Sequence, residues 1–372
     1  MTNTTRTSRT PSRHFAIYVA AVLTLASSSA FAQTDAELDD QEQRFTEILR
    51  RVEPIQARFE PILFAHPGAV AVGIGLDAAF EPTLVVAVAD RRLVDQLPTK
   101  FEGIPLDVHV THLPRLEDGG PACNGGAGPP CHREQLPLPV QMGNSGAWVQ
   151  ATACTMGFKA CDLDSGTSVL VTNAHCADLN TTCFMAPIGE DFQHTSPADE
   201  VIPGSGVVIG DIAGHAMPVC GAPDNRVDAT KVTSAFFQSS KTIRDIGTPK
   251  DVTGKVHVPG WRIELSGRTT GFNSGRIRAV NATVNVPANA YCCGALTMRK
   301  QYMWQWDSYS SNFGDSGQAA VLRTQPGGAR DMRLVGLHWG SDGTFGYLNH
   351  IQEVLAKLNL TLDFTKCGFP AD

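Results

Sequence analysis

The sequence has no run of basic side chains, and its 37 acidic residues outnumber its 30 Lys and Arg residues. Nucleic-acid-binding proteins normally carry a basic face, so we expect no nucleic-acid partner. Past residue 32, no stretch approaches the roughly 18 apolar residues that a membrane helix requires. Internal repeats are absent, and the only low-complexity tract is short and rich in Gly and Pro. We therefore expect neither a repeat array nor a membrane partner once the first segment is removed.

The first 32 residues have the pattern of a targeting segment. Three arginines, at positions 6, 9 and 13, precede an apolar run over residues 15–26 that is too short to span a bilayer comfortably. Ala30-Phe31-Ala32 is an A-x-A cleavage sequence. A membrane anchor is the alternative interpretation, and the small-residue cleavage sequence argues against it. We expect a secreted or periplasmic protein from which residues 1–32, the signal peptide, are removed.

Composition bounds the fold of the remaining chain. Hydrophobic residues make up 42% of the 372 positions, which is enough to bury a core. The length predicts two domains, at roughly 100–200 residues for each domain. Glycine (35 residues) and proline (23 residues) favour many turns and a β-rich body over a helical bundle.

All ten cysteines follow the expected cleavage position, and an even number in an exported chain predicts disulfides. Zinc binding is the alternative, because Cys131 is followed by His132. Paired C-x-x-C motifs are absent, so we expect no metal. Cys123 and Cys131 are expected to close a small loop. The adjacent Cys292 and Cys293 are expected to bond to different partners, since a disulfide between neighbours is strained.

Residues 33–115 predict a helix followed by a small β-α-β domain. From Asp35 to Phe64 apolar residues recur at three- and four-residue spacing, which is typical of a helix, and Pro54 and Pro61 should kink or end it. Strands are predicted at residues 69–74, 83–89 and 106–110, with a short helix at residues 91–97. A pro-segment or partner helix is one interpretation of the first helix. We favour the other, a helix packed on its own domain.

Residues 116–138 are predicted to be a Gly/Pro-rich linker. In residues 139–372, short apolar stretches alternate with Gly, Asn, Asp and Pro, which is typical of an all-β domain. A domain of that length is compatible with two small β-barrels. A helix packed on this body is expected from Leu348 to Leu360.

Three motifs in the all-β region supply the parts of a nucleophilic site. They are Thr172-Asn173-Ala174-His175-Cys176, Arg226-Val227-Asp228-Ala229-Thr230 and Gly314-Asp315-Ser316-Gly317. A serine hydroxyl needs an adjacent base, a histidine can take and return its proton, and a buried carboxylate orients the histidine. The expected catalytic residues are Ser316, His175 and Asp228. The amides of Gly314 and Ser316 are expected to stabilise the developing oxyanion.

The order His, Asp, Ser is that of chymotrypsin, and residues 140–372 resemble a chymotrypsin-like (trypsin-fold) serine protease. The sequence at residues 172–176 is similar to the family's T-A-A-H-C, with Asn173 as the departure. Residues 334–341, L-V-G-L-H-W-G-S, resemble its V-G-x-x-S-W-G strand. The resemblance implies an all-β fold of two six-stranded antiparallel barrels with a C-terminal helix, here preceded by the small α/β domain. It also implies a disulfide around the histidine loop, which we expect between Cys161 and Cys176.

The sequence G-R-T-T-G at residues 267–271, followed by Ser274-Gly275, resembles the alpha-lytic-type proteases of the bacterial branch. Animal members place a newly cut N-terminus beside the acid that precedes the catalytic serine, but this chain has no I-V-G-G sequence. The resemblance implies an ion pair between Arg268 and Asp315, because an unpaired buried carboxylate is costly. An arginine in a surface loop is the alternative.

The resemblance also locates a substrate pocket. We expect it to contain Ser310, Ser311, His338, Trp339 and Gly340. Ser310 stands where trypsin-like enzymes carry an acid, which argues against cleavage after Lys or Arg. His338 replaces the serine of the S-W-G sequence and resembles the histidine with which glutamyl endopeptidases hold a substrate carboxylate. In the alternative interpretation, His338 only supports Asp228.

The expected function is a secreted serine endopeptidase that acts on protein or peptide substrates as a monomer, without a cofactor. One alternative is a trypsin-fold module that binds a peptide or partner without turnover. A further hypothesis is latency, in which residues 33 to about 135 block the cleft or assist folding.

Overall fold

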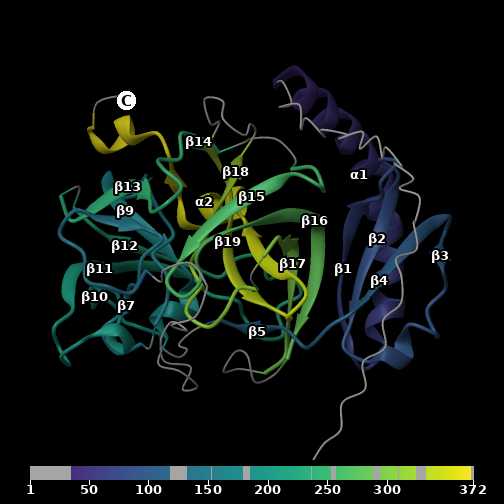
Figure 1. Cartoon of the computed structure of the whole chain (residues 1–372), viewed down its shortest axis with the longest axis horizontal. Helices are drawn as coiled ribbons and strands as arrows, with labels where there is room; N and C mark the ends of the chain where they lie inside the picture. The colour runs from purple at the N-terminus through teal and green to yellow at the C-terminus, as the bar shows by residue number, and fades with distance from the viewer. Residues whose placement is uncertain are drawn as a thin grey trace, which may run out of the picture. The chain divides into compact units, whose positions relative to one another are not determined.

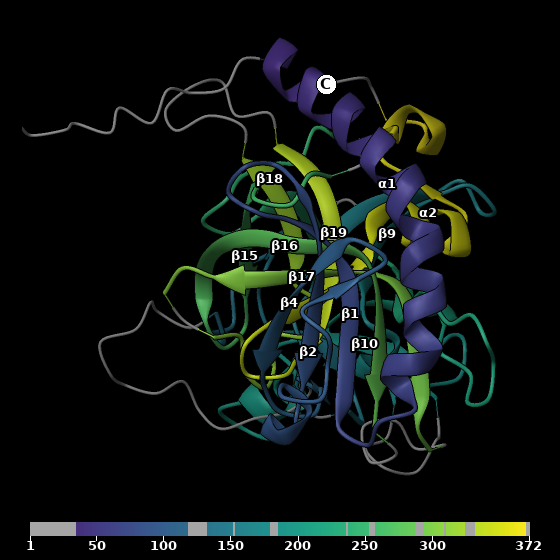
Figure 2. The ribbon, with the colours of Figure 1, turned by 90° about the vertical axis from the view of Figure 1, so that its right-hand side faces the viewer.

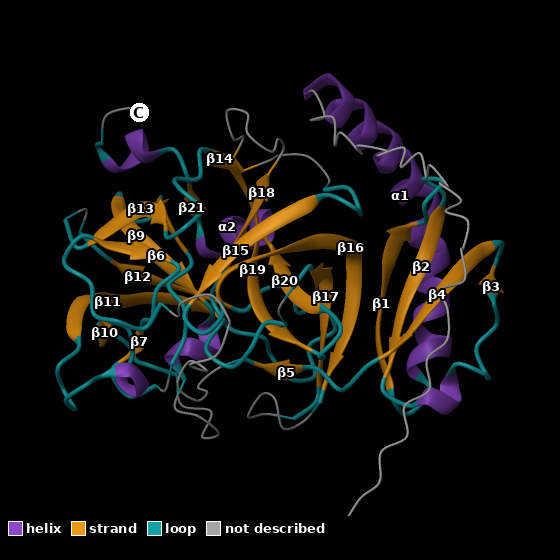
Figure 3. Cartoon of the chain, in the orientation of Figure 1, coloured by secondary structure: helices purple, strands orange, loops and turns teal. Residues whose placement is uncertain are grey.

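The computed structural model describes residues 35–117, 132–151, 153–178, 185–235, 237–252, 257–287, 294–308, 310–323 and 332–369. From Gln33 to Asp372 the chain forms one compact unit. Strands dominate this unit (Figure 3), as predicted from the composition. Within the described ranges, no helix is both long enough and apolar enough to cross a membrane.

The N-terminal region begins with a 30-residue helix, α1 (Asp35–Phe64). Phe45, Val52 and Phe59 are fully buried, and their seven-residue spacing places them on one face of the helix. α1 runs beside β1 (Ala69–Leu76), as Figure 2 shows, and the buried face shares an apolar core with Val72 and Ile74 of that strand. The helix continues through Pro54 and Pro61, so the prolines do not end it. Burial of the apolar face holds the helix together where each proline lacks an N–H donor.

A small sheet follows α1. Its other strands are β2 (Pro82–Val88), β3 (Lys100–Phe101) and β4 (Ile104–Val110), and a 3₁₀ turn, η1 (Arg91–Leu93), precedes β3. β1 and β2 are antiparallel, whereas β2 and β4 are parallel. β1, β2 and β4 lie within two residues of the three predicted strands, whereas the helix predicted at residues 91–97 is only the three-residue turn η1, and β3 was not predicted.

The N-terminal sheet continues into the C-terminal region. β1 pairs antiparallel with β16 (Gly271–Val286), so that Ala71 lies opposite Val284 and Val72 lies opposite Thr283 (Figure 1). The buried face of α1 also shares one apolar core with residues of the C-terminal region, including Val258 and Ile263. One sheet and one core therefore join parts that the sequence separates by a linker.

Six strands of the C-terminal region form a ring. They are β15 (Arg262–Gly267), β16, β17 (Leu296–Trp306), β18 (Ala319–Arg323), β19 (Met332–Ser341) and β20 (Gly346–His350). The order β15-β18-β19-β20-β17-β16 closes because β15 pairs with both β18 and β16. Two short strands, β5 (Arg115–Leu116) and β14 (Asp251–Val252), also pair with β19. This ring has the six strands expected of one barrel.

The second large sheet differs from the prediction of another six-stranded barrel. It has seven strands in the order β21-β8-β9-β12-β11-β10-β7. Their bounds are β7 (Ala147–Trp148), β8 (Phe158–Asp162), β9 (Thr167–Thr172), β10 (Asp191–His194), β11 (Val207–Ala216), β12 (Ala229–Thr233) and β21 (Leu360–Thr361). The extra strand, β21, comes from the C-terminal segment and pairs with β8.

The remaining elements are short. β6 (Val140–Met142) and β13 (Ser239–Ile243) form a separate parallel pair. The predicted C-terminal helix is α2 (Ile351–Leu358), which is shorter than expected. Three further 3₁₀ turns are η2 (Ala174–Ala177), η3 (Pro197–Asp199) and η4 (Phe364–Cys367).

The predicted Cys161–Cys176 disulfide is wrong, because Cys176 bonds to Cys154 and Cys161 bonds to Cys367. The β8–β9 hairpin explains the difference. Its register places Cys161 opposite Ser168, so Cys176, eight residues farther on, lies level with the residues that precede β8. Cys123, Cys131, Cys292 and Cys293, for which bonds are also predicted, lie outside the described residues.

Candidate active site

Two adjacent strands bring His175 and Asp228 together. β9 and β12 are antiparallel with Thr172 opposite Thr230, and two residues farther on this register places Ala174 opposite Asp228. Asp228 Oδ1 accepts hydrogen bonds from the backbone N–H groups of Ala174 (2.7 Å) and His175 (3.2 Å). Its Oδ2 lies 2.5 Å from His175 Nδ1. Both side chains are buried, so the carboxylate is positioned to hold the imidazole with its other ring nitrogen, Nε2, directed away from Asp228.

The backbone of Asp228 is itself anchored by two buried amide side chains. Asn173 Nδ2 donates to the Asp228 carbonyl at 2.7 Å, and Asn349 Nδ2 donates to it at 3.0 Å. Asn349 Oδ1 also accepts from Asp228 N at 3.1 Å. Asn173, the departure from the family's T-A-A-H-C, thus has a structural reason: it fixes the strand that carries the acid.

Ser316 lies on a turn between two glycines with φ values of +93° (Gly314) and +94° (Gly317). L-residues rarely adopt this conformation, and a Cβ on Gly317 would lie 2.1 Å from the Thr155 carbonyl oxygen. The turn aligns the N–H groups of Gly314 and Ser316, as predicted for an oxyanion site. Ser316 Oγ accepts from Glu117 N at 3.1 Å and donates to Trp339 O at 3.1 Å.

Glu117 occupies this site, which the sequence analysis did not predict. Its carbonyl oxygen accepts hydrogen bonds from Gly314 N and from Ser316 N, the latter at 3.4 Å. Its amide nitrogen donates to Ser316 Oγ. Glu117, the second residue of the predicted linker (residues 116–138), is therefore bound with its peptide group against the serine and both predicted oxyanion donors.

The Glu117 side chain is fully buried in a polar pocket. Oε1 accepts hydrogen bonds from Ser311 Oγ (3.0 Å) and Ser341 Oγ, and Oε2 lies 2.8 Å from His338 Nε2. Ser311 and His338, which the sequence analysis expects in a substrate pocket, both bind the Glu117 carboxylate. Ser341 was missed, although it ends the same S-W-G-like strand.

Other predicted pocket residues have different positions. Trp339 presents its backbone carbonyl to Ser316, and Gly340 pairs with Leu116 in the β5–β19 ladder. Ser310, also expected in the pocket, is exposed. Its neighbour Ser311 is the residue that turns inward.

The partners of His338 distinguish between its two interpretations. Its Nδ1 accepts from Trp304 Nε1 at 3.4 Å, and its Nε2 faces Glu117. The residues that support Asp228 are instead Asn173 and Asn349. His338 therefore belongs to the pocket and is not a support for the acid.

The predicted Arg268–Asp315 ion pair is wrong. Arg268 pairs with Asp199: Nε lies 2.7 Å from Oδ2 and Nη2 lies 2.5 Å from Oδ1, and both side chains are fully buried. Asp315 is satisfied by backbone N–H groups of Thr269, Thr270 and Asn312 at 2.9–3.1 Å. Peptide donors therefore replace the expected guanidinium. Burial, followed by the nearby Glu117 carboxylate, raises the pKa of Asp315 to about 6.

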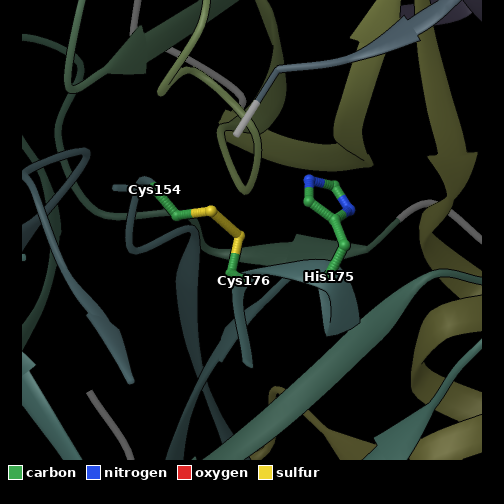
Figure 4. Close-up of side chains that lie close together, drawn as sticks. All are labelled: Cys154, His175 and Cys176. Carbon is green, nitrogen blue, oxygen red and sulfur yellow. A yellow bond between two sulfur atoms is a disulfide. The ribbon is translucent and has the colours of Figure 1, made fainter. Parts of the chain in front are cut away.

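Cys154, His175 and Cys176 are clustered (Figure 4), with one potential ligand atom from each within 4.8 Å of the others. The two sulfurs are bonded to each other, so neither is a thiolate that can bind a metal. The disulfide instead fixes the histidine segment near the serine. Cys176 Sγ lies 3.9 Å from the Ser316 carbonyl oxygen.

Several solved structures are similar to this chain. Thermobifida fusca protease A has 18% identity and a TM-score of 0.41, with 60% of this chain and 97% of that protein covered. A glutamic acid specific serine protease that uses a histidine triad in substrate binding has 21% identity and a TM-score of 0.42, with 60% and 100% covered. Nocardiopsis protease has 20% identity and a TM-score of 0.40, with 60% and 98% covered.

Among curated proteins, no relative matches this chain. Residues 141–354 match the family model described as Trypsin. The matched region includes His175, Asp228 and Ser316 and covers more than half of the 372 residues. The resemblance expected from the three motifs is thereby confirmed, and the chain belongs to the trypsin family of serine proteases.

Proposed function

We propose that this protein is a secreted serine endopeptidase that hydrolyses the peptide bond following a glutamate residue. The observation that carries the proposal is the position of Glu117. Its carbonyl oxygen accepts from the N–H groups of Gly314 and Ser316 while its carboxylate is bound in a separate polar pocket. This is the arrangement that a substrate residue needs on the acyl side of the cleaved bond.

The reaction follows from the groups at the site. Ser316 Oγ attacks the carbonyl carbon, and His175 takes the hydroxyl proton and transfers it to the departing amine. Asp228 holds the tautomer of His175 in which Nδ1 carries a proton, and it stabilises the imidazolium that forms. The N–H groups of Gly314 and Ser316 stabilise the negative charge on the carbonyl oxygen. Water then hydrolyses the acyl-enzyme ester by the same route in reverse.

The pocket favours a carboxylate because three of its side chains donate hydrogen bonds to one. Ser311, Ser341 and His338 all bind the Glu117 carboxylate. Hydrogen bonds to a charged acceptor are roughly twice as strong as those between neutral groups. A substrate without a group that accepts from these donors would leave buried polar groups unpaired, which enzymes discriminate against strongly. Secretion is supported by the predicted signal peptide and by the disulfides.

The test uses the full chain with Glu117→Lys, because lysine cannot accept from the pocket donors and the site is left open. The probes are two fluorogenic peptides, acetyl-Pro-Arg-Leu-Glu-aminocoumarin and its Gln counterpart, together with an organic fluorophosphonate. We expect labelling of Ser316, and cleavage of the Glu peptide with at least about 100-fold higher kcat/KM than the Gln peptide.

Addition of Ser316→Ala to the same chain is the matched control and must abolish both labelling and hydrolysis. A folded protein that is neither labelled nor active would contradict the proposal and indicate a module that binds peptides without turnover. Hydrolysis with equal rates for the two peptides would leave a serine endopeptidase but exclude selection for glutamate.

A further inference from the structure

The end of the N-terminal region is bound to the site as an extended peptide. Arg115 and Leu116 pair antiparallel with Ser341 and Gly340 of β19. Addition of a peptide strand to an exposed strand is a general mode of peptide recognition. A Cβ on Gly340 would lie 2.2 Å from the Arg115 carbonyl oxygen, so glycine at this position allows the two backbones to approach.

Contacts upstream keep this segment in place. Thr111 Oγ1 and His112 N both donate to the Asp342 carbonyl oxygen, at 2.8 and 3.0 Å. The Arg115 guanidinium lies 4.6 Å from the centre of the Phe313 ring. The Leu116 side chain joins an apolar cluster that contains Trp339. Residues 111–117 therefore follow the edge of the site continuously and end with Glu117 against Ser316.

Simple packing does not account for this arrangement. Burial of a carboxylate is costly unless donors compensate it, and an apolar residue would fill the same space at lower cost. Here Ser311, His338 and Ser341 are all buried and all bind Glu117. Its carbonyl group also lies where negative charge develops in the reaction. The contacts thus match those needed by a substrate.

We propose that the peptide bond between Glu117 and Asp118 is the first substrate of this enzyme, and that the chain cleaves it intramolecularly. The inference rests on the proposed function. It identifies the N-terminal region up to Glu117 as a pro-region that the protease domain removes from itself and then retains as a bound product.

The cleavage is balanced as one hydrolysis. Ser316 Oγ forms an ester with the Glu117 carbonyl carbon, the bond to the Asp118 nitrogen breaks, and His175 transfers the hydroxyl proton to that nitrogen. One water then cleaves the ester, which leaves a terminal carboxylate on Glu117 and restores the Ser316 hydroxyl. The remaining chain begins with the free amine of Asp118.

Cleavage does not by itself empty the site. The pro-region still pairs through β1 with β16, and Glu60 still binds Arg299 (2.7 Å) and Thr283 (2.7 Å). The terminal residue keeps its pocket contacts as well. We therefore expect the cleaved pro-region to remain bound and to inhibit the enzyme until it is displaced or degraded.

The experiment follows the purified full chain over time by intact mass and by N-terminal sequencing. The wild-type chain should yield a new N-terminus at Asp118 with a first-order rate that does not change over a 100-fold dilution, and the two fragments should elute together. Ser316→Ala should stay intact. Glu117→Gln should slow the cleavage at least about 100-fold, whereas Glu81→Gln, a matched change at an exposed glutamate, should leave the rate unchanged.

The two proposals fail in distinguishable ways. If Glu117→Lys hydrolyses the Glu peptide but the wild-type chain remains uncut at Glu117, the enzyme functions as proposed and self-cleavage is excluded. If neither Glu117→Lys nor the wild-type chain cleaves any bond, the proposed function fails as well. Cleavage at Asp118 whose rate rises with protein concentration would contradict the intramolecular reaction.

Discussion

At the scale of single residues, the proton on His338 determines what the pocket accepts. Trp304 Nε1 donates to His338 Nδ1 at 3.4 Å, so the tautomer that fits carries its proton on Nε2. That proton faces Glu117 Oε2 at 2.8 Å. His338 Nε2 thus serves as the donor, and Trp304 acts by positioning the ring. Trp304 itself is fully buried and does not touch the carboxylate.

Replacement of His338 by alanine in the Glu117→Lys chain should weaken catalysis mainly for glutamate substrates. Loss of one buried hydrogen bond to a charged group costs about 1.5–3 kcal/mol, which corresponds to roughly a 10- to 150-fold lower kcat/KM. The Gln peptide should lose less, because its neutral amide gains less from the donor. Steady-state kinetics with both peptides measure the effect.

A matched histidine change outside the site controls for nonspecific damage. His66 is partly exposed in the turn after α1, and His66→Ala should leave both kcat/KM values unchanged. Equal losses for the Glu and Gln peptides in His338→Ala would show that the histidine does not select the carboxylate.

Sequence reasoning identified residues whose chemistry is recognisable within a short motif. His175, Asp228 and Ser316 each stand in such a motif, and the pairing of the first two is seen in the structure. Glu117 has no local motif, because the residues that bind its side chain lie 194, 221 and 224 positions away. Its only sequence signal was an acidic residue at the start of the Gly/Pro-rich tract.

Partners are harder to predict than charges. The buried Arg268 pairs with a carboxylate, but that carboxylate is Asp199 and not the predicted Asp315. Three backbone N–H groups bind Asp315. Because every residue except proline has a backbone N–H group, the amino-acid sequence does not indicate which of them will bind a carboxylate.

At the scale of elements, register explains both a success and an error. The β9–β12 register predicts that the histidine and acid motifs meet, since it places Ala174 level with Asp228. The β8–β9 register separates Cys161 from Cys176 and brings Cys176 level with Cys154. The number of residues between two cysteines does not reveal how the strands between them pair. The predicted disulfide therefore joins Cys176 to Cys161, whereas the true partner of Cys176 is Cys154.

The α1–β16 contact depends on one buried acidic residue. Glu60 of α1 accepts hydrogen bonds from Gln56 (3.0 Å), Thr283 (2.7 Å) and Arg299 (2.7 Å). Glu60→Ala in the uncleaved Ser316→Ala chain removes the acceptor of Thr283 Oγ1 and the carboxylate partner of Arg299, whereas Gln56 keeps its carbonyl acceptors. This loss should lower the free energy of unfolding by about 1–3 kcal/mol. Urea denaturation measures the loss, and hydrogen exchange should locate it in α1 and β1.

Glu53 provides the control for this change, because it lies exposed on the same helix. Glu53→Ala should alter the free energy of unfolding by less than about 0.5 kcal/mol. If the two variants are equally stable, Glu60 does not hold the pro-region on the C-terminal region.

At the scale of the whole molecule, continuity between the two regions was not predictable. The composition changes at the Gly/Pro-rich tract, which favours separate domains. The structure instead joins β1 to β16 and buries α1 against the C-terminal core. The apolar sequence of β1 suits a strand that pairs only within the small N-terminal sheet. It equally suits a strand that also pairs with β16 of the C-terminal region, as the structure has it. Only the folded chain distinguishes these cases.

Stability of the whole chain should fall in mild acid because two histidines are buried in their neutral form. Burial lowers the pKa of His257 to about 3 and the pKa of His350 to about 4. Unfolding returns both to about 6.5, so the unfolded chain binds protons first as the pH falls. The stabilisation is complete above pH 6.5 and is lost towards the folded pKa values. Between pH 7 and pH 5 each of these two histidines should lower the free energy of unfolding by about 2 kcal/mol.

Asp315 opposes this loss, because its pKa of about 6 means that the folded chain binds a proton there before the unfolded chain does. Protonation of Asp315 should return about 1 kcal/mol between pH 7 and pH 5, so His257, His350 and Asp315 together should lower the free energy of unfolding by about 2–3 kcal/mol. Burial also lowers the pKa values of His132, His194 and His215, which adds to the loss in the same direction. Urea denaturation of the Ser316→Ala chain at the two pH values measures the sum.

His350→Asn retains an acceptor for Gln352 N at the start of α2 but does not titrate, so it should reduce the pH-dependent loss by about 2 kcal/mol. An unchanged loss in that variant would mean that His350 is not the group that takes up the proton.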